Sequence, residues 1–120
     1  MRTIMVVDDE PEIVSILGEF LEREGFRVIR CSGGKEALGT LKNEPSIELA
    51  VLDSKMPEVN GAAVLKELES MKLPVRTVML TGSADWKATH PDVKCDMVMI
   101  KPVELDELLD AINTLLGSRI

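Results

Sequence analysis

The sequence predicts an α/β protein built as a three-layer, doubly wound, five-stranded parallel sheet. Two observations lead to this prediction. Short apolar runs alternate along the chain with segments whose apolar residues recur at helical spacing, an order typical of βαβ units. Several of the runs are apolar at consecutive positions, as in strands that are buried on both faces. The length of 120 residues suits one domain, residues 1–120, without an internal repeat or linker.

The first strand and helix are predicted near the start of the chain. Thr3–Val7 is an apolar run that stops at a group of carboxylates. Pro11 suits the first turn of a helix, and Gly25 suits its C-terminal end. The apolar residues that recur at helical spacing between them are Ile13, Ile16, Leu17, Phe20 and Leu21.

The next two elements are less apolar. Phe26–Cys31 is predicted to be a strand, and its residues Arg27 and Arg30 place it at the edge of the sheet. A short helix follows, opened by two glycines and stopped before Pro45.

Leu49–Asp53 holds four apolar side chains and ends in a single carboxylate. It predicts a fully buried strand whose last residue, Asp53, lies at the carboxyl edge of the sheet, where ligands of open α/β sheets bind. A turn-rich loop over residues 56–61 precedes a helix. The apolar face of that helix consists of Val64, Leu65, Leu68 and Met71.

The last part of the chain predicts two strands and one regular helix. The strands are Val75–Leu80 and Met97–Ile100, and the segment 84–95 between them has few apolar residues and contains Pro91. We therefore expect only a short or frayed helix in that segment. The final helix ends at Gly117, and its apolar residues are Leu105, Leu108, Leu109, Ile112, Leu115 and Leu116.

Composition excludes some functions. The chain carries 14 basic and 21 acidic residues, a net charge of −7, which argues against nucleic-acid binding by this domain. No apolar run is long enough to cross a membrane and no signal-peptide pattern is present, so we expect a cytoplasmic protein without membrane contact. Cys31 and Cys95 are far apart and lack metal-type spacing. Reduced thiols are therefore expected, with a disulfide as the alternative.

Polar residues of particular types follow four of the five predicted strands. They are Asp8 and Asp9, Asp53, Thr81, and Lys101. The carboxyl ends of parallel strands meet at one edge of a sheet, so these side chains are expected to lie together. Each close pair of carboxylates would repel by about 4 kcal/mol at an effective dielectric of 20. Such a group of hard oxygen ligands suits Mg²⁺.

The same residues suit phosphoryl transfer, which depends on positioning and on neutralising the phosphoryl oxygens. Asp53 could attack as a carboxylate nucleophile and form an aspartyl phosphate. Mg²⁺, Lys101 and the Thr81 hydroxyl could each take one of the three phosphoryl oxygens. Taken alone, Asp8 and Asp9 could instead be helix caps, and Lys101 could be a solvated surface lysine.

Over its whole length the chain resembles a response regulator receiver domain, the CheY-like fold of two-component signalling. The matching features are Val6-Val7-Asp8-Asp9, Asp53 with Met56-Pro57 and Gly61 downstream, Leu80-Thr81, and Lys101-Pro102. The resemblance implies a flavodoxin-like sheet in strand order 2-1-3-4-5, with two helices on one face and three on the other. It also implies a phosphorelay function rather than ordinary enzymatic turnover, with only Mg²⁺-dependent self-phosphorylation and slow self-dephosphorylation.

The resemblance also implies roles for single residues. Asp53 would take a phosphoryl group from a phosphohistidine on a sensor histidine kinase or phosphotransfer protein. Asp9, Asp53 and the backbone carbonyl of Lys55 would bind Mg²⁺ directly, and Asp8 would act mainly through water. The Lys101–Pro102 bond would be cis. A downstream effector domain or target protein would receive the signal, and a homodimer is a further possibility.

One part of the family pattern is missing. The family couples the residue at Thr81 to an aromatic ring in the fifth strand, but Val98 stands at that position and the chain has no Tyr. Gly82 and Val103 also replace the usual Ala and Phe. We therefore predict a weaker or different conformational response around the fourth helix and fifth strand.

The remaining residues of interest have ordinary alternatives. Lys55 and Ser83 either tune the lifetime of the phosphoryl group or are plain surface residues. His90 is expected in a loop, and Trp86 is expected to be partly exposed. Two other functions stay open: a constitutive interaction module that does not signal through phosphate, and a phosphohydrolase that uses an aspartyl intermediate. The residue two positions after Asp53 is Lys55 rather than a second catalytic Asp, which disfavours the phosphohydrolase.

Overall fold

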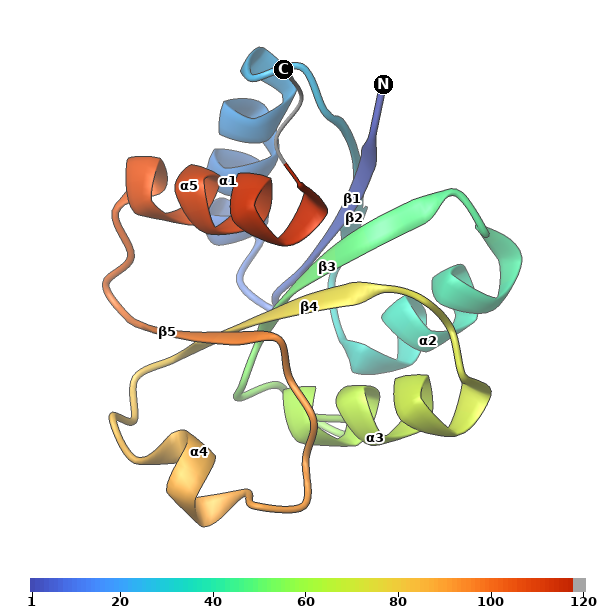
Figure 1. The fold of residues 1–120 in the computed structure, drawn as a ribbon, viewed down its shortest axis with the longest axis vertical. Coiled ribbons are helices and arrows are strands. Elements are labelled where there is room, and N and C mark those ends of the chain that lie inside the picture. The colour runs from blue at the N-terminus through green and yellow to red at the C-terminus, as the bar shows by residue number, and fades with distance from the viewer. Residues whose placement is uncertain (118–120) are drawn as a thin grey trace.

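The computed structural model describes residues 1–117 and has the predicted three layers (Figure 1). A five-stranded parallel sheet has the strand order β2-β1-β3-β4-β5, which confirms the predicted topology. The predicted domain covers residues 1–120, of which residues 118–120 lie outside the described part of the chain. The strands are β1 (Thr3–Val7), β2 (Arg27–Cys31), β3 (Ile47–Asp53), β4 (Arg76–Thr81) and β5 (Met97–Ile100). The helices are α1 (Pro11–Arg23), α2 (Gly34–Asn43), α3 (Gly61–Met71), α4 (Trp86–Thr89) and α5 (Leu105–Leu116).

The helices cover the two faces of the sheet unequally. α1 and α5 lie on one face, and α2, α3 and α4 lie on the other (Figure 1). Alternate residues of the central strands enter different cores: Ile4 and Val6 of β1 pack beneath α1 and α5, whereas Met5 and Val7 pack on the opposite face. This two-residue alternation is why a strand inside an α/β protein is apolar at every position.

Helix α1 begins at Pro11 and is followed by Gly25 with φ of 95°, a left-handed conformation that favours glycine, as predicted. One of its predicted apolar residues is on the wrong side. Ile16 is 53% exposed, and Val14 is buried instead. The buried stripe follows Val14, Leu17, Gly18 and Leu21, and Ile16 lies off this stripe because helical residues advance about 100° per position.

The second half of the chain confirms the weak fourth helix. α4 spans only four residues, and Pro91 follows shortly after it. The prediction for Trp86 is wrong, because its side chain is only 5% exposed and belongs to the core beneath α2, α3 and α4. Its position in a polar, Pro-interrupted segment concealed this, since the segment lacks the periodicity that marks a buried face.

Both cysteines are free: Cys31 is buried and Cys95 is half-buried. Burial raises the pKa of each thiol, so both favour the protonated form. The prediction of unpaired thiols is confirmed. Within residues 1–117, no helix is both long and apolar enough to cross a membrane.

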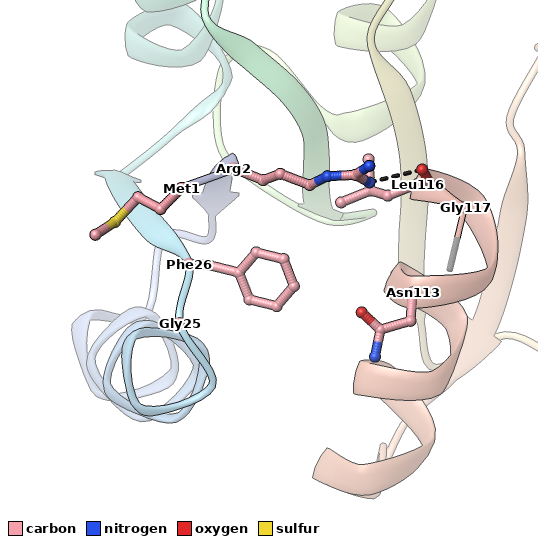
Figure 2. A pocket seen from close by; sticks show the side chains of 7 residues that line it. All are labelled: Met1, Arg2, Gly25, Phe26, Asn113, Leu116 and Gly117. Atoms are coloured by element: carbon pink, nitrogen blue, oxygen red, sulfur yellow. Dashed lines mark hydrogen bonds between the residues drawn. The ribbon is translucent and has the colours of Figure 1, made fainter. Parts of the chain in front are cut away.

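The amino edge of the sheet carries a shallow pocket of about 390 Å³. Figure 2 shows the side chains of Arg2, Phe26 and Asn113 around it, with the Arg2 guanidinium directed at the end of α5. Arg2 Nη1 donates to the carbonyl oxygen of Leu116 at 2.6 Å. This bond ties the start of β1 to the last turn of α5, at the edge of the sheet opposite the predicted functional site.

Candidate functional site

The site lies at the carboxyl edge of the sheet. Asp8 and Asp9 follow β1, Asp53 ends β3, Thr81 ends β4, and Lys101 follows β5. β1 and β3 are adjacent strands from which the chain winds outward in opposite directions, so the strand order reverses between them. A reversal of this kind opens a crevice at the carboxyl ends of the strands, where α/β proteins bind ligands.

Three carboxylates form the centre of the site. One oxygen each from Asp8, Asp9 and Asp53 lies within 4.8 Å of the others. Asp8 and Asp53 are 2% and 5% exposed, whereas Asp9 is exposed to solvent. The sequence prediction that these three residues converge is thus matched by their positions in the fold.

Asp8 is the most perturbed acid of the cluster. Burial and the nearby charge of Asp53 raise the pKa of Asp8 to about 6, against the lowering effects of a hydrogen bond from the Glu10 N–H and of the Lys101 charge. The Glu10 N–H donates to Asp8 Oδ1 at 2.9 Å. Glu10 itself is the N-cap of α1 and makes no side-chain capping bond. Asp8 therefore binds backbone near the helix start, but the helix cap is another residue.

Lys101 supplies the positive charge of the site. Its Nζ donates to Asp53 Oδ1 at 2.7 Å and lies 4.0 Å from Asp8 Oδ2. Burial alone would lower the pKa of Lys101, but the hydrogen bond and charge of Asp53, together with the charge of Asp8, outweigh it and raise that pKa. Lys101 therefore stays cationic at neutral pH.

Thr81 is buried at the end of β4, the strand next to β3. It is 1% exposed, and its Oγ1 accepts a hydrogen bond from the Ser83 N–H at 3.1 Å. Its carbonyl oxygen accepts from the Lys101 N–H at 2.7 Å, which joins the end of β4 to the residue after β5. The Lys101–Pro102 peptide bond is cis.

The start of α3 packs closely against the backbone of Asp53. The sequence did not predict the contacts that hold it there. The Asn60 side chain accepts from the Ala63 N–H at 2.9 Å and caps the helix. A Cβ at Gly61 would lie 2.6 Å from the carbonyl oxygen of Asp53, so only glycine allows this approach. In the sequence, the pair Asn60-Gly61 directly before an apolar periodic segment could have predicted this capped helix start.

The other predicted residues lie in the loops after β3 and β4 and in β5. Lys55 is exposed and Ser83 is half-buried, in the loops that follow β3 and β4. Val98 pairs with Met79 across β4 and β5, and it packs against the core beneath α2, α3 and α4. Val98 is therefore part of a packed core rather than of the carboxylate cluster.

The donor set fits magnesium. Three carboxylates from two adjacent strand ends provide hard oxygen ligands, and the raised pKa of Asp8 shows the electrostatic cost that a divalent cation would relieve. A soft or transition metal would favour thiolate or imidazole ligands, and neither kind of side chain is part of this cluster of described residues.

The fold and the acidic site together define a doubly wound α/β protein with an acidic cluster at the carboxyl ends of its strands. The sequence model of the response regulator receiver domain matches residues 4–113, and the chain belongs to this family. Members of the family are components of two-component systems and act as signalling domains rather than as ordinary enzymes.

Relatives and solved structures agree with this assignment. The response regulator SaeR of Staphylococcus aureus is 37% identical over 118 residues, which cover 97% of this chain and 51% of SaeR. The chain thus spans about half the length of the curated relatives it matches. The response regulator TrrA of Thermotoga maritima, solved in complex with Mg²⁺ and BeF, is 30% identical with a TM-score of 0.88, covering 96% of this chain and 99% of TrrA.

A CheY-like receiver domain protein from Methanospirillum hungatei is 28% identical to this chain, with a TM-score of 0.89. The alignment covers 97% of this chain and 94% of that protein. The CheY-like arrangement predicted from sequence is therefore confirmed.

Proposed function

We propose that Asp53 accepts a phosphoryl group from a phosphohistidine on a sensor histidine kinase or a phosphotransfer protein. The observation that carries this proposal is that Asp53 contacts the positively charged Lys101 and also belongs to a cluster with the carboxylates of Asp8 and Asp9. Asp53 Oδ1 lies 2.7 Å from the Lys101 ammonium. Phosphoryl transfer needs a positioned nucleophile and neutralised oxygens, and this arrangement supplies both.

In the proposed step, a carboxylate oxygen of Asp53 attacks the phosphorus in line with the leaving nitrogen. The new O–P bond forms as the N–P bond breaks, and the electron pair of that bond stays on the imidazole nitrogen. Lys101 turns one donor to an arriving phosphoryl oxygen, and the Thr81 hydroxyl donates to another. Later attack of water on phosphorus releases inorganic phosphate and restores the Asp53 carboxylate.

The proposed cofactor is Mg²⁺, which when bound neutralises the carboxylates and the phosphoryl oxygens. Asp9, Asp53 and the Lys55 carbonyl would hold the ion, with Asp8 beside them. The compact oxygen cluster supports this assignment, as does the complex of the 30% identical TrrA with Mg²⁺ and BeF. Besides lying next to the proposed ion, Asp8 accepts a hydrogen bond from the Glu10 N–H, and this bond holds the start of α1 next to the site.

The wider biology is also a proposal. Residues 1–120 would act as one receiver domain in the cytoplasm, without direct nucleic-acid or membrane binding. They would pass the state of Asp53 to a downstream effector domain or target protein, with a homodimer as one form of output. The net charge of −7 and the family membership support this picture.

The test is incubation with acetyl phosphate and Mg²⁺, followed by intact mass measurement. We expect one phosphoryl adduct in the wild type and in Asp106→Ala, a control at an exposed position of α5. We expect none in Asp53→Ala, and none when EDTA removes the metal. An adduct that survives in Asp53→Ala would refute the assignment of the nucleophile. Complete absence of an adduct would favour a constitutive interaction module, and rapid turnover of phosphate esters would favour a phosphohydrolase.

A further inference from the structure

Trp86 is the only tryptophan of the chain, and it anchors a helix that is otherwise exposed. Its side chain is 5% exposed and belongs to the same buried cluster as Met56 and Met79. The other three residues of α4 are exposed, so the Trp86 side chain provides the buried attachment of this helix to the body of the domain. Any movement of α4 must therefore move this ring.

Two hydrogen bonds of the Ser83 backbone join Trp86 to Thr81. The Ser83 N–H donates to Thr81 Oγ1 at 3.1 Å, and the Ser83 carbonyl accepts from the Trp86 N–H at 3.2 Å. Ser83 also donates through its hydroxyl to the Asp85 carboxylate. Both backbone polar groups of Ser83 are thus engaged, one by the site hydroxyl and the other by Trp86.

His90 covers the other side of the tryptophan. The two rings stack with centroids 4.5 Å apart and planes inclined by 15°. His90 Nδ1 lies 2.8 Å from the Trp86 carbonyl oxygen and 3.0 Å from the Thr89 hydroxyl oxygen. The Thr89 hydroxyl donates to the same carbonyl at 3.0 Å. Trp86 and His90 therefore form one packed unit at the end of the β4–α4 connection.

No other aromatic ring among the described residues is placed to respond. Phe20 and Phe26 pack against the core beneath α1 and α5, on the opposite face of the sheet. β5 carries Met and aliphatic residues, with Val98 beside Met79. The pair of Trp86 and His90 is thus the aromatic unit on the face that Thr81 reaches through Ser83.

We propose that Trp86 and His90 report the state of Asp53 to the surface of the protein. This inference rests on the proposed function. When Asp53 carries a phosphoryl group, the Thr81 hydroxyl turns to donate to it, and the Ser83 N–H loses its acceptor. A backbone N–H without a partner is unfavourable, so residues 82–85 rearrange. Because Ser83 holds the Trp86 N–H, the indole then shifts against the core and against His90.

Trp86 fluorescence tests this directly, since the chain has a single tryptophan. The protein is measured in Mg²⁺ before and after acetyl phosphate is added, and intact mass gives the adduct fraction of each sample. We expect a shift of the emission maximum and stronger quenching by acrylamide, both in proportion to the adduct. In His90→Ala, we expect stronger quenching already without phosphate and a smaller further change. Phe20→Leu, on the opposite face, should respond like the wild type.

The outcomes separate the two proposals. A normal adduct with unchanged Trp86 emission and quenching would overturn the role of Trp86 while leaving Asp53 as phosphoacceptor. A His90→Ala response equal to that of the wild type would remove His90 from the reporting unit. If no adduct forms in the wild type, the proposed function and this inference both fail.

Discussion

Replacing Asp8 by Asn should stabilise the metal-free protein at neutral pH. The pKa of Asp8 is raised from 3.8 to about 6, so the folded protein binds this proton more tightly than the unfolded chain does. The free energy of unfolding should therefore fall as the pH rises from about 4 to about 6. At 1.36 kcal/mol per pKa unit, the loss is about 2–3 kcal/mol at pH 7.

Asn has nearly the shape of Asp and keeps an oxygen that can accept from the Glu10 N–H, so the substitution removes mainly the charge. Urea unfolding in EDTA at pH 7.5 should show Asp8→Asn to be about 2 kcal/mol more stable than the wild type, and the gap should close below about pH 4. Asp110→Asn, exposed on α5, is the matched control and should change stability by less than about 0.5 kcal/mol.

The same urea unfolding should also be measured in Mg²⁺ instead of EDTA. Mg²⁺ should stabilise the wild type more than Asp8→Asn, because a ligand that binds only the folded state stabilises it according to its affinity. The gap seen in EDTA should therefore narrow or reverse. Equal or lower stability of Asp8→Asn in EDTA at pH 7.5 would refute the argument, as would a gap that does not depend on pH.

Three further substitutions test single contacts. Lys101→Met removes the 2.7 Å bond to Asp53 and should slow adduct formation from acetyl phosphate about 100-fold, as measured by intact mass; an unchanged rate would exclude the proposed role of the lysine. Gly61→Ala places a methyl 2.6 Å from the Asp53 carbonyl oxygen and should cost about 1–3 kcal/mol in urea unfolding, whereas Gly39→Ala, in open space within α2, should not destabilise. Asn60→Ala removes the cap of α3 and should cost about 1 kcal/mol by the same assay; Asn113→Ala, exposed in α5, should cost little.

The residues at the strand ends show best how much of the site could be predicted from the sequence. Asp8, Asp9, Asp53 and Thr81 each follow an apolar run, and parallel strands bring their carboxyl ends to one edge. Topology alone therefore predicts that they meet. The 2.7 Å bond from Lys101 to Asp53 is different, because a flexible lysine on an adjacent loop can also extend into solvent.

Trp86 and Ile16 show where prediction failed. Both sit in segments where local pattern is ambiguous: Trp86 in a four-residue helix without periodicity, and Ile16 one position away from a buried stripe. Hydrophobicity shows that a side chain favours burial, but which residues are covered depends on the neighbouring elements that pack against them. The links from Thr81 through Ser83 to Trp86 are likewise set by loop geometry and are not visible in the spacing of residues.

The amino-acid sequence alone determined the α/β class and the set of residues at the carboxyl edge, through apolar runs, helical periodicity, and the polar residues at the strand ends. The strand order was implied only by the resemblance of the chain to the receiver family. Only the tertiary structure decided the charge state of Asp8, the bond between Lys101 and Asp53, and the burial of Trp86 against His90. Those depend on desolvation and on distances between side chains far apart in the chain, which exist only once the sheet and helices have packed.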